Sequence, residues 1–178
     1  ESEDYDSWSE TALNEEKLLK LITKLDTDKK IIIIDACNSG GFINNITDID
    51  GIPPNYLENI NENEDKIFSR AIDIYFSNSL RDDYPDISYE DAIVLTASGE
   101  QEYSVELYSI EHGLFTYYFL RSADHADING DGYITATESY AYTSASLDIN
   151  WNSYISSDYQ YHPHITGAPV DLVLFPAE

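Results

Sequence analysis

Cys37, the only cysteine in the chain, follows an apolar run and begins a short polar segment. Four isoleucines at 31–34 precede it, and residues 35–41 read Asp-Ala-Cys-Asn-Ser-Gly-Gly. A thiolate at the carboxyl end of a strand is a good nucleophile, and backbone N–H groups beside it can stabilise an oxyanion. The glycine pair would let a substrate backbone come close. The alternative is that Cys37 is a small buried core residue, as cysteine often is.

A second group of residues has the types and spacing of a calcium ligand set. Residues 127–138 match every defined position of the EF-hand loop pattern, Asp-x-[Asp/Asn]-x-[Asp/Asn]-Gly followed by five residues and Glu. Ca²⁺ takes oxygen ligands. The ligands expected are the side chains of Asp127, Asn129 and Asp131, the backbone carbonyl of Tyr133 and both carboxylate oxygens of Glu138. Because the loop occurs once, Ca²⁺ is expected to stabilise the structure and not to signal.

The segment around the cysteine resembles the nucleophile segment of caspase-like cysteine peptidases, and it is closer to the metacaspase and prokaryotic caspase-homologue branch than to animal caspases. The resemblance implies that Cys37 is the nucleophile of an endopeptidase. It also implies that Asp35 lines the pocket for the residue before the cleaved bond, so that cleavage would follow Arg or Lys. Ser98 resembles a strand-end serine that borders the same pocket. Capping for Asp35 and ordinary turn chemistry for Ser98 are the alternatives.

Two further segments extend the resemblance over most of the chain. Residues 112–120 are similar to a Gly-x-Phe-Thr helix that packs behind the sheet in that family, although packing alone explains their aromatic spacing. Residues 160–163 are similar to the segment before the last strand, which would then be 170–174. The region 42–91 has no counterpart in the resemblance.

The catalytic histidine that the resemblance implies is not in its usual place. In that family it precedes the cysteine by about 50 residues, whereas all four histidines here follow Cys37. We therefore expect a domain that is incomplete at its N-terminus, with the histidine outside this chain. The other interpretation is an inactive caspase-like scaffold or interaction domain that binds calcium. His112 is expected to be structural, and His162 and His164 are not expected to bind a metal, because Pro163 separates them and no carboxylate or cysteine is suitably spaced.

The remaining pattern predicts an α/β fold. Residues 31–34 and 92–98 are predicted as adjacent parallel strands, the first of them buried on both faces. Helical spacing of apolar residues predicts helices at 13–25, 115–123 and 137–145. Together with the resemblance, this implies a three-layer caspase-like fold: a mostly parallel sheet flanked by helices, with an inserted EF-hand-like loop.

Residues 42–91 are predicted to form a long, acidic surface loop with one amphipathic stretch at 67–76. The resemblance makes Lys66, Arg70 and Arg81 conceivable sites of self-cleavage, but a solvated insertion is the preferred interpretation for each. We treat residues 1–178 as one peptidase domain, because nothing in the sequence suggests a second large core.

Charge sets limits on the partners. The chain has 34 acidic and 9 basic residues and a net charge of −25, so nucleic acid is not an expected partner, whereas Ca²⁺ and basic peptides are. The expected partners are a peptide or protein substrate with a basic residue at the cleavage site and an N-terminal chain of the same precursor. No apolar run is long enough to span a membrane. Secretion is weakly favoured, because such a loop stays filled where calcium is abundant.

Overall fold

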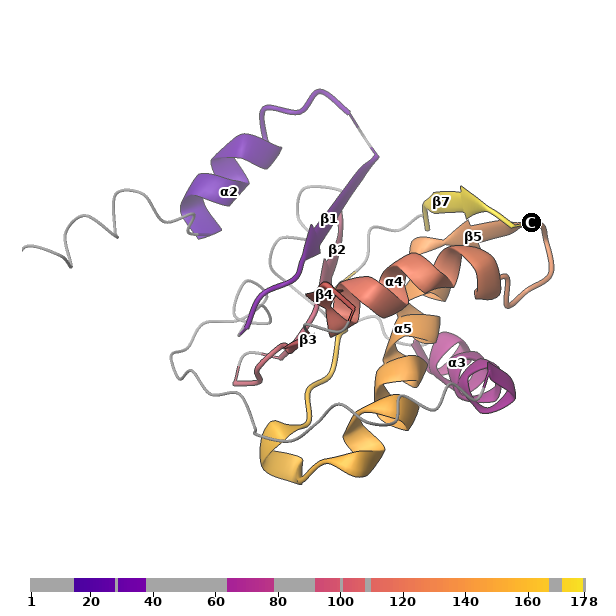
Figure 1. The fold of residues 1–178 in the computed structure, drawn as a ribbon. Coiled ribbons are helices and arrows are strands. Elements are labelled where there is room, and N and C mark those ends of the chain that lie inside the picture. Colours follow the sequence, from indigo (N-terminus) through magenta and orange to yellow (C-terminus); the bar gives the residue numbers. More distant parts are fainter. Residues whose placement is uncertain are drawn as a thin grey trace, which may run out of the picture.

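A three-stranded sheet lies at the centre of the fold (Figure 1). Strand β1 (Lys30–Ile34) runs parallel to β2 (Ala92–Thr96), with Ile32 opposite Val94, and β6 (His164–Thr166) is antiparallel to β2 on its other side. The predicted parallel pairing of the two apolar runs is confirmed. The computed structural model describes residues 15–27, 29–37, 64–78, 92–99, 101–107, 110–166 and 171–177.

Burial differs sharply between the two parallel strands. Every residue of β2 is buried, whereas β1 is mostly half-buried and the Ile33 side chain is 44% exposed. The prediction that 31–34 is buried on both faces is therefore wrong. The reason is topological, since within the described part of the chain β1 lies at the edge of the sheet and has β2 as its one neighbour.

Helices cover both faces of this sheet. On one face, Ile22 of α2 (Glu15–Ile22) packs against Val94. On the other face, Phe115 and Phe119 of α4 (Leu114–His125) pack against the two residues that flank Val94 in β2, which are Ile93 and Leu95. The alternation follows from strand geometry, in which successive side chains point to opposite faces. The chain is thus a mixed α/β protein, with one parallel and one antiparallel pairing in its central sheet instead of the mostly parallel sheet that was predicted.

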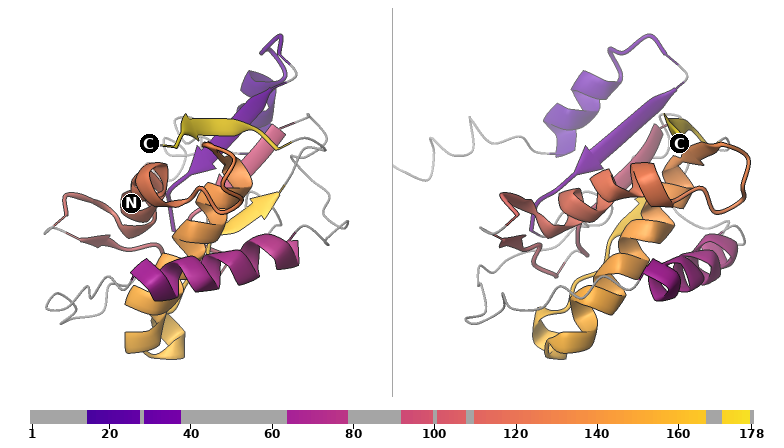
Figure 2. Two further views of the ribbon diagram at one scale, coloured as in Figure 1. Left: turned by 90° about the vertical axis from the view of Figure 1, so that its right-hand side faces the viewer. Right: turned by 45° about the vertical axis from the view of Figure 1, so that its right-hand side comes forward.

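A second layer of packing joins α5 (Ala136–Asn150) to α3 (Glu64–Asn78), which lies across it (Figure 2). Ile67 and Ala71 of α3 are fully buried and share a cluster with Tyr142 of α5. The amphipathic stretch predicted at 67–76 is thereby confirmed as part of a longer helix. The rest of 42–91, Arg81 included, lies outside the described residues.

Two small antiparallel pairs complete the fold. Strand β3 (Glu106–Leu107) pairs with β4 (His112–Gly113), and β5 (Tyr133–Thr135) pairs with β7 (Val173–Pro176). The last strand was predicted at 170–174, and the last strand of the structure is β7, which pairs with β5 and not with the central sheet. The 3₁₀ turns are η3 (Asn152–Tyr154) and η4 (Ser157–Tyr159).

A helix that crosses a bilayer must be both long and predominantly apolar. Within the described ranges, no helix is both long enough and apolar enough to cross a membrane.

Candidate functional site

Cys37 lies three residues beyond β1, at the carboxyl end of the strand, and its side chain is exposed. The thiol donates a hydrogen bond to the backbone carbonyl oxygen of Ser104 (Sγ to O, 3.4 Å), and the Ser104 hydroxyl donates to Sγ at 3.7 Å. An exposed thiol at a strand end is not a core residue, so the alternative of simple packing does not describe Cys37.

Asp35 lies directly beside the start of α4. Its Oδ2 accepts a hydrogen bond from the Thr116 hydroxyl. A Cβ atom on Gly113 would lie 2.3 Å from the same oxygen, so the carboxylate occupies space that only a glycine leaves open. The charge of Asp35 also affects a buried tyrosine. Burial foremost, and then the charges of Asp35 and Tyr118, raise the pKa of Tyr161 well above its usual value.

Ser98 lies just after β2 and contacts the segment that contains Asp35 and Cys37. Its side chain is fully buried, and its hydroxyl donates to the backbone carbonyl oxygen of Ala36 at 3.2 Å. Ser98 therefore ties the end of β2 to the residue that separates Asp35 from Cys37. Cys37, Asp35 and Ser98 do lie in one region, at the ends of β1 and β2. Ser98 is buried there and hydrogen-bonds to the backbone between the other two residues.

Glu102 holds the loop after β2 in place, and sequence reasoning did not single it out. Its carboxylate accepts from the backbone N–H groups of Gly99 (2.8 Å) and His162 (2.7 Å) and pairs with Nδ1 of His162 at 2.8 Å. Burial alone would raise the pKa of Glu102, but the hydrogen bonds from His162 and Gly99 outweigh it and lower that pKa. The pKa of His162 is raised by the hydrogen bond to Glu102, against the opposing effect of burial. Ser104, two residues further on, is thus presented to Cys37.

The histidines do not provide a partner for the thiol. No hydrogen bond joins Cys37 to a histidine in the part of the chain that the structure describes. His112 is exposed in β4, and the His125 ring stacks on Tyr142 with 5.8 Å between ring centroids. A carboxylate partner for His162 does exist in Glu102, contrary to the expectation from spacing, because the fold brings together residues 60 positions apart.

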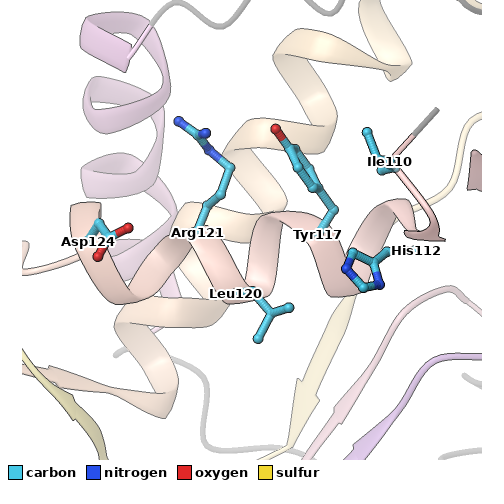
Figure 3. A pocket seen from close by; sticks show the side chains of 6 residues that line it. All are labelled: Ile110, His112, Tyr117, Leu120, Arg121 and Asp124. Atoms are coloured by element: carbon cyan, nitrogen blue, oxygen red, sulfur yellow. The ribbon is translucent and has the colours of Figure 1, made fainter.

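A shallow hollow of about 510 Å³ lies along α4. Figure 3 shows the side chains that line it, with Tyr117 and Arg121 projecting from the same side of the helix. Arg121 forms an ion pair with Glu64 at 2.8 Å, so its charge is already neutralised. Cys37, Asp35 and Ser98 are not among the residues that line this hollow, which are Ile110, His112, Tyr117, Leu120, Arg121 and Asp124.

The loop at 127–138 is wound around its own oxygen atoms. Asp127 accepts hydrogen bonds from the backbone N–H groups of Gly130, Asp131 and Gly132 at 2.9 to 3.1 Å, and Asn129 Oδ1 accepts from Asp131 at 2.9 Å. Gly130 and Gly132 have φ of 73° and 86°, a region that favours glycine.

Glu138 closes the loop from its far end. Its Oε1 accepts from the backbone N–H groups of Ile128 (3.1 Å) and Asn129 (3.2 Å), and its Oε2 accepts from Thr135 N–H at 3.0 Å. Thr135 and Glu138 together form a capping box at the start of α5. Ile134 is 1% exposed and anchors the loop in the core, as its inward position in the pattern predicts.

Oxygen donors of this kind suit Ca²⁺, a hard cation. Among the described side chains, no group of three or more His, Cys, Asp or Glu residues is arranged so that it could hold a metal ion. The loop instead has its carboxylates engaged with backbone N–H groups. By chemical type alone, the oxygen donors of the expected set suit Ca²⁺; that set is Asp127, Asn129, Asp131, Tyr133 and Glu138.

Comparison of the chain with models of known protein families, with curated proteins and with solved structures finds no match.

Proposed function

We propose that this chain carries the nucleophile of a cysteine endopeptidase that cleaves after Arg or Lys. The observation that carries the proposal is the placement of an exposed thiol and a carboxylate two residues apart at the carboxyl end of β1, where α/β sheets commonly form their sites. The resemblance of residues 35–41 to the nucleophile segment of caspase-like peptidases supports the same reaction.

In the proposed reaction, the Cys37 thiolate attacks the carbonyl carbon of the scissile peptide and forms a C–S bond. The carbonyl oxygen becomes an oxyanion that the backbone N–H of Cys37 stabilises. A histidine from an N-terminal chain of the same precursor first accepts the thiol proton and then gives a proton to the leaving amine as the C–N bond breaks. Water hydrolyses the thioester, which releases the carboxylic acid and restores the thiol.

Specificity is assigned to Asp35, because a carboxylate attracts the guanidinium or ammonium group of a basic side chain. Ser98 would keep Asp35 and Cys37 in register through its bond to the carbonyl oxygen between them. Acidic substrates would be repelled both by Asp35 and by the net charge of −25.

Calcium is proposed to stabilise the fold and to take no part in the chemistry. The loop begins after the last turn of α4, whereas Asp35 lies at its first turn, and 12 helical residues span about 18 Å. Asp127, Asn129, Asp131, Tyr133 and Glu138 would hold the ion, and its charge would offset the acidic side chains of the loop.

The test is hydrolysis of fluorogenic peptides that end in Arg, Lys or Asp by the whole protein, with calcium and with a chelator, beside Cys37→Ala. We expect cleavage after Arg and Lys that Cys37→Ala abolishes. Cleavage that survives in Cys37→Ala, or that follows Asp, would contradict the proposal.

One observation favours a second candidate, a calcium-binding scaffold without catalysis. The thiol donates to the Ser104 carbonyl and is not bonded to any described histidine. Absence of cleavage of all three peptides, with a folded protein that still binds calcium, would support the scaffold.

A further inference from the structure

Asp35 is held by the first turn of a helix that is far away in the sequence. Thr116 donates its hydroxyl proton to Oδ2, and Gly113 leaves the space that this oxygen fills. The other carboxylate oxygen, Oδ1, makes no hydrogen bond to any described residue. Among the described residues, the carboxylate is thus held by a hydrogen bond at Oδ2 alone.

The first turn of α4, which holds Asp35, is buried and hydrogen-bonded to the rest of the fold. Leu114 and Phe115 are 1% and 0% exposed, and both pack in the core on opposite sides of the turn. The Leu114 N–H donates to the Val105 carbonyl oxygen at 2.8 Å. Because the two residues before Thr116 are packed in the core, the position of its hydroxyl relative to β1 is well defined.

The start of α4 also provides a favourable potential for a carboxylate. Gly113 is the N-cap and makes no side-chain capping bond, so the partial positive charge of the helix N-terminus faces Asp35.

From this geometry we infer that Thr116 and Gly113 are positioning residues for substrate recognition, which hold Asp35 with Oδ1 presented to the guanidinium or amidinium group of a basic substrate. This inference rests on the proposed function and deepens it. A carboxylate that is oriented beforehand loses little side-chain entropy on binding, so removal of its anchor should weaken binding of the cation. Thr116 does not touch the substrate.

The competing explanation is that Asp35 merely caps α4. Capping and positioning differ in what they affect: capping changes stability, whereas positioning changes affinity for a cation. Thr116→Val removes the donor at nearly constant shape, and Thr116→Ser keeps it, so the two variants form a matched pair.

The experiment is a fluorescence titration of the whole protein with p-aminobenzamidine, an aromatic amidinium, at fixed ionic strength, with thermal unfolding of each variant. We expect Kd to rise roughly tenfold in Thr116→Val, as for loss of a hydrogen bond to a charged group. Thr116→Ser should restore the wild-type Kd, and Asp35→Asn should abolish binding.

The outcomes separate the two proposals. If Asp35→Asn loses binding while Thr116→Val binds like the wild type, the positioning role is wrong and the proposed specificity stands. If Thr116→Val and Thr116→Ser weaken binding equally, the hydroxyl is not the anchor and the inference also fails. If the wild type does not bind, or Asp35→Asn binds equally well, Asp35 is not a cation site, and both proposals are overturned.

Discussion

Gly113 and Asp35 are the two residues whose fit is tightest in this site. A methyl group on Gly113 would lie 2.3 Å from Asp35 Oδ2, a distance that no real contact sustains. The glycine is thus required by its neighbour across the fold and not by its own backbone, which has an ordinary negative φ of −58°.

Gly113→Ala is therefore expected to destabilise the protein by about 1–3 kcal/mol, the usual cost of overpacking. Asp35→Ala removes the carboxylate that the new methyl group would meet, so Gly113→Ala should cost much less in that background. Chemical denaturation of the four members of this double-mutant cycle measures the coupling. Additive free energies would show that the clash is relieved elsewhere.

The Glu102–His162 pair predicts how stability depends on pH. The pKa of His162 is raised above 6.5, so its contribution is complete below that value and is lost as pH rises through the raised pKa. The pKa of Glu102 is lowered below 4.5, so its contribution is complete above that value and is lost as pH falls through the lowered pKa. The pair should stabilise most between about 4.5 and 6.5.

Thermal unfolding across pH 4 to 9 in the wild type and in His162→Gln checks this expectation. The difference in stability between the two proteins should be greatest in that window and shrink at higher pH. A difference that grows as pH rises would mean that the pair is not charged as described.

At the scale of elements, the calcium loop joins α4, α5 and the β5–β7 pair. Glu138 is fully buried and accepts hydrogen bonds from three backbone N–H groups, so it organises the loop as well as serving as an expected ligand. Gln at this position has one accepting oxygen and keeps only part of these hydrogen bonds, and it binds Ca²⁺ weakly.

Calcium is expected to raise the melting temperature of the wild type, by an amount that follows the logarithm of its concentration above Kd. Glu138→Gln should lose most of this shift, whereas Asp124→Asn, the same loss of one charge on exposed surface just before the loop, should keep it. Calorimetry with calcium and with EDTA measures both. An equal shift in Glu138→Gln would locate the stabilising calcium elsewhere.

The positions of the helices and strands were predicted more reliably than their burial and their pairing partners. The spacing of apolar residues predicts β1, β2, α4 and α5, because each segment has the period of its element. The same reasoning fails for the burial of β1, because an isoleucine run reports apolar character and not which neighbours a strand has. It also placed the last strand at 170–174, whereas β7 is Val173–Pro176 and pairs with β5 in the calcium loop.

In the site, the sequence predicts Cys37, Asp35 and Ser98 from local pattern, and the structure brings all three to the same sheet edge. It does not predict Thr116 or Glu102, because their contacts cross 81 and 60 positions. A polar residue in the first turn of an otherwise apolar helix and an acidic residue in a loop after a strand have too many ordinary explanations. Only the fold pairs them with Asp35 and His162.

At the scale of the whole molecule, the fold separates two regions along α4. Its first turn holds the carboxylate proposed to select substrate, and its last turn leads into the calcium loop. With a net charge of −25, the molecule attracts cations to both regions. This common electrostatic preference is consistent with a basic substrate at one end of the helix and calcium at the other.

The most direct test of the central claim is to treat the whole protein with a peptidyl chloromethyl ketone that ends in Arg and, separately, with the same reagent that ends in Asp. Mass spectrometry of the protein then shows whether Cys37 has been alkylated. Iodoacetamide serves as the control for bare thiol reactivity. We expect rapid, stoichiometric alkylation at Cys37 by the Arg reagent alone, blocked by Asp35→Asn. Equal slow labelling by both reagents, at the rate set by iodoacetamide reactivity, would show a free thiol without a substrate site and would contradict the account.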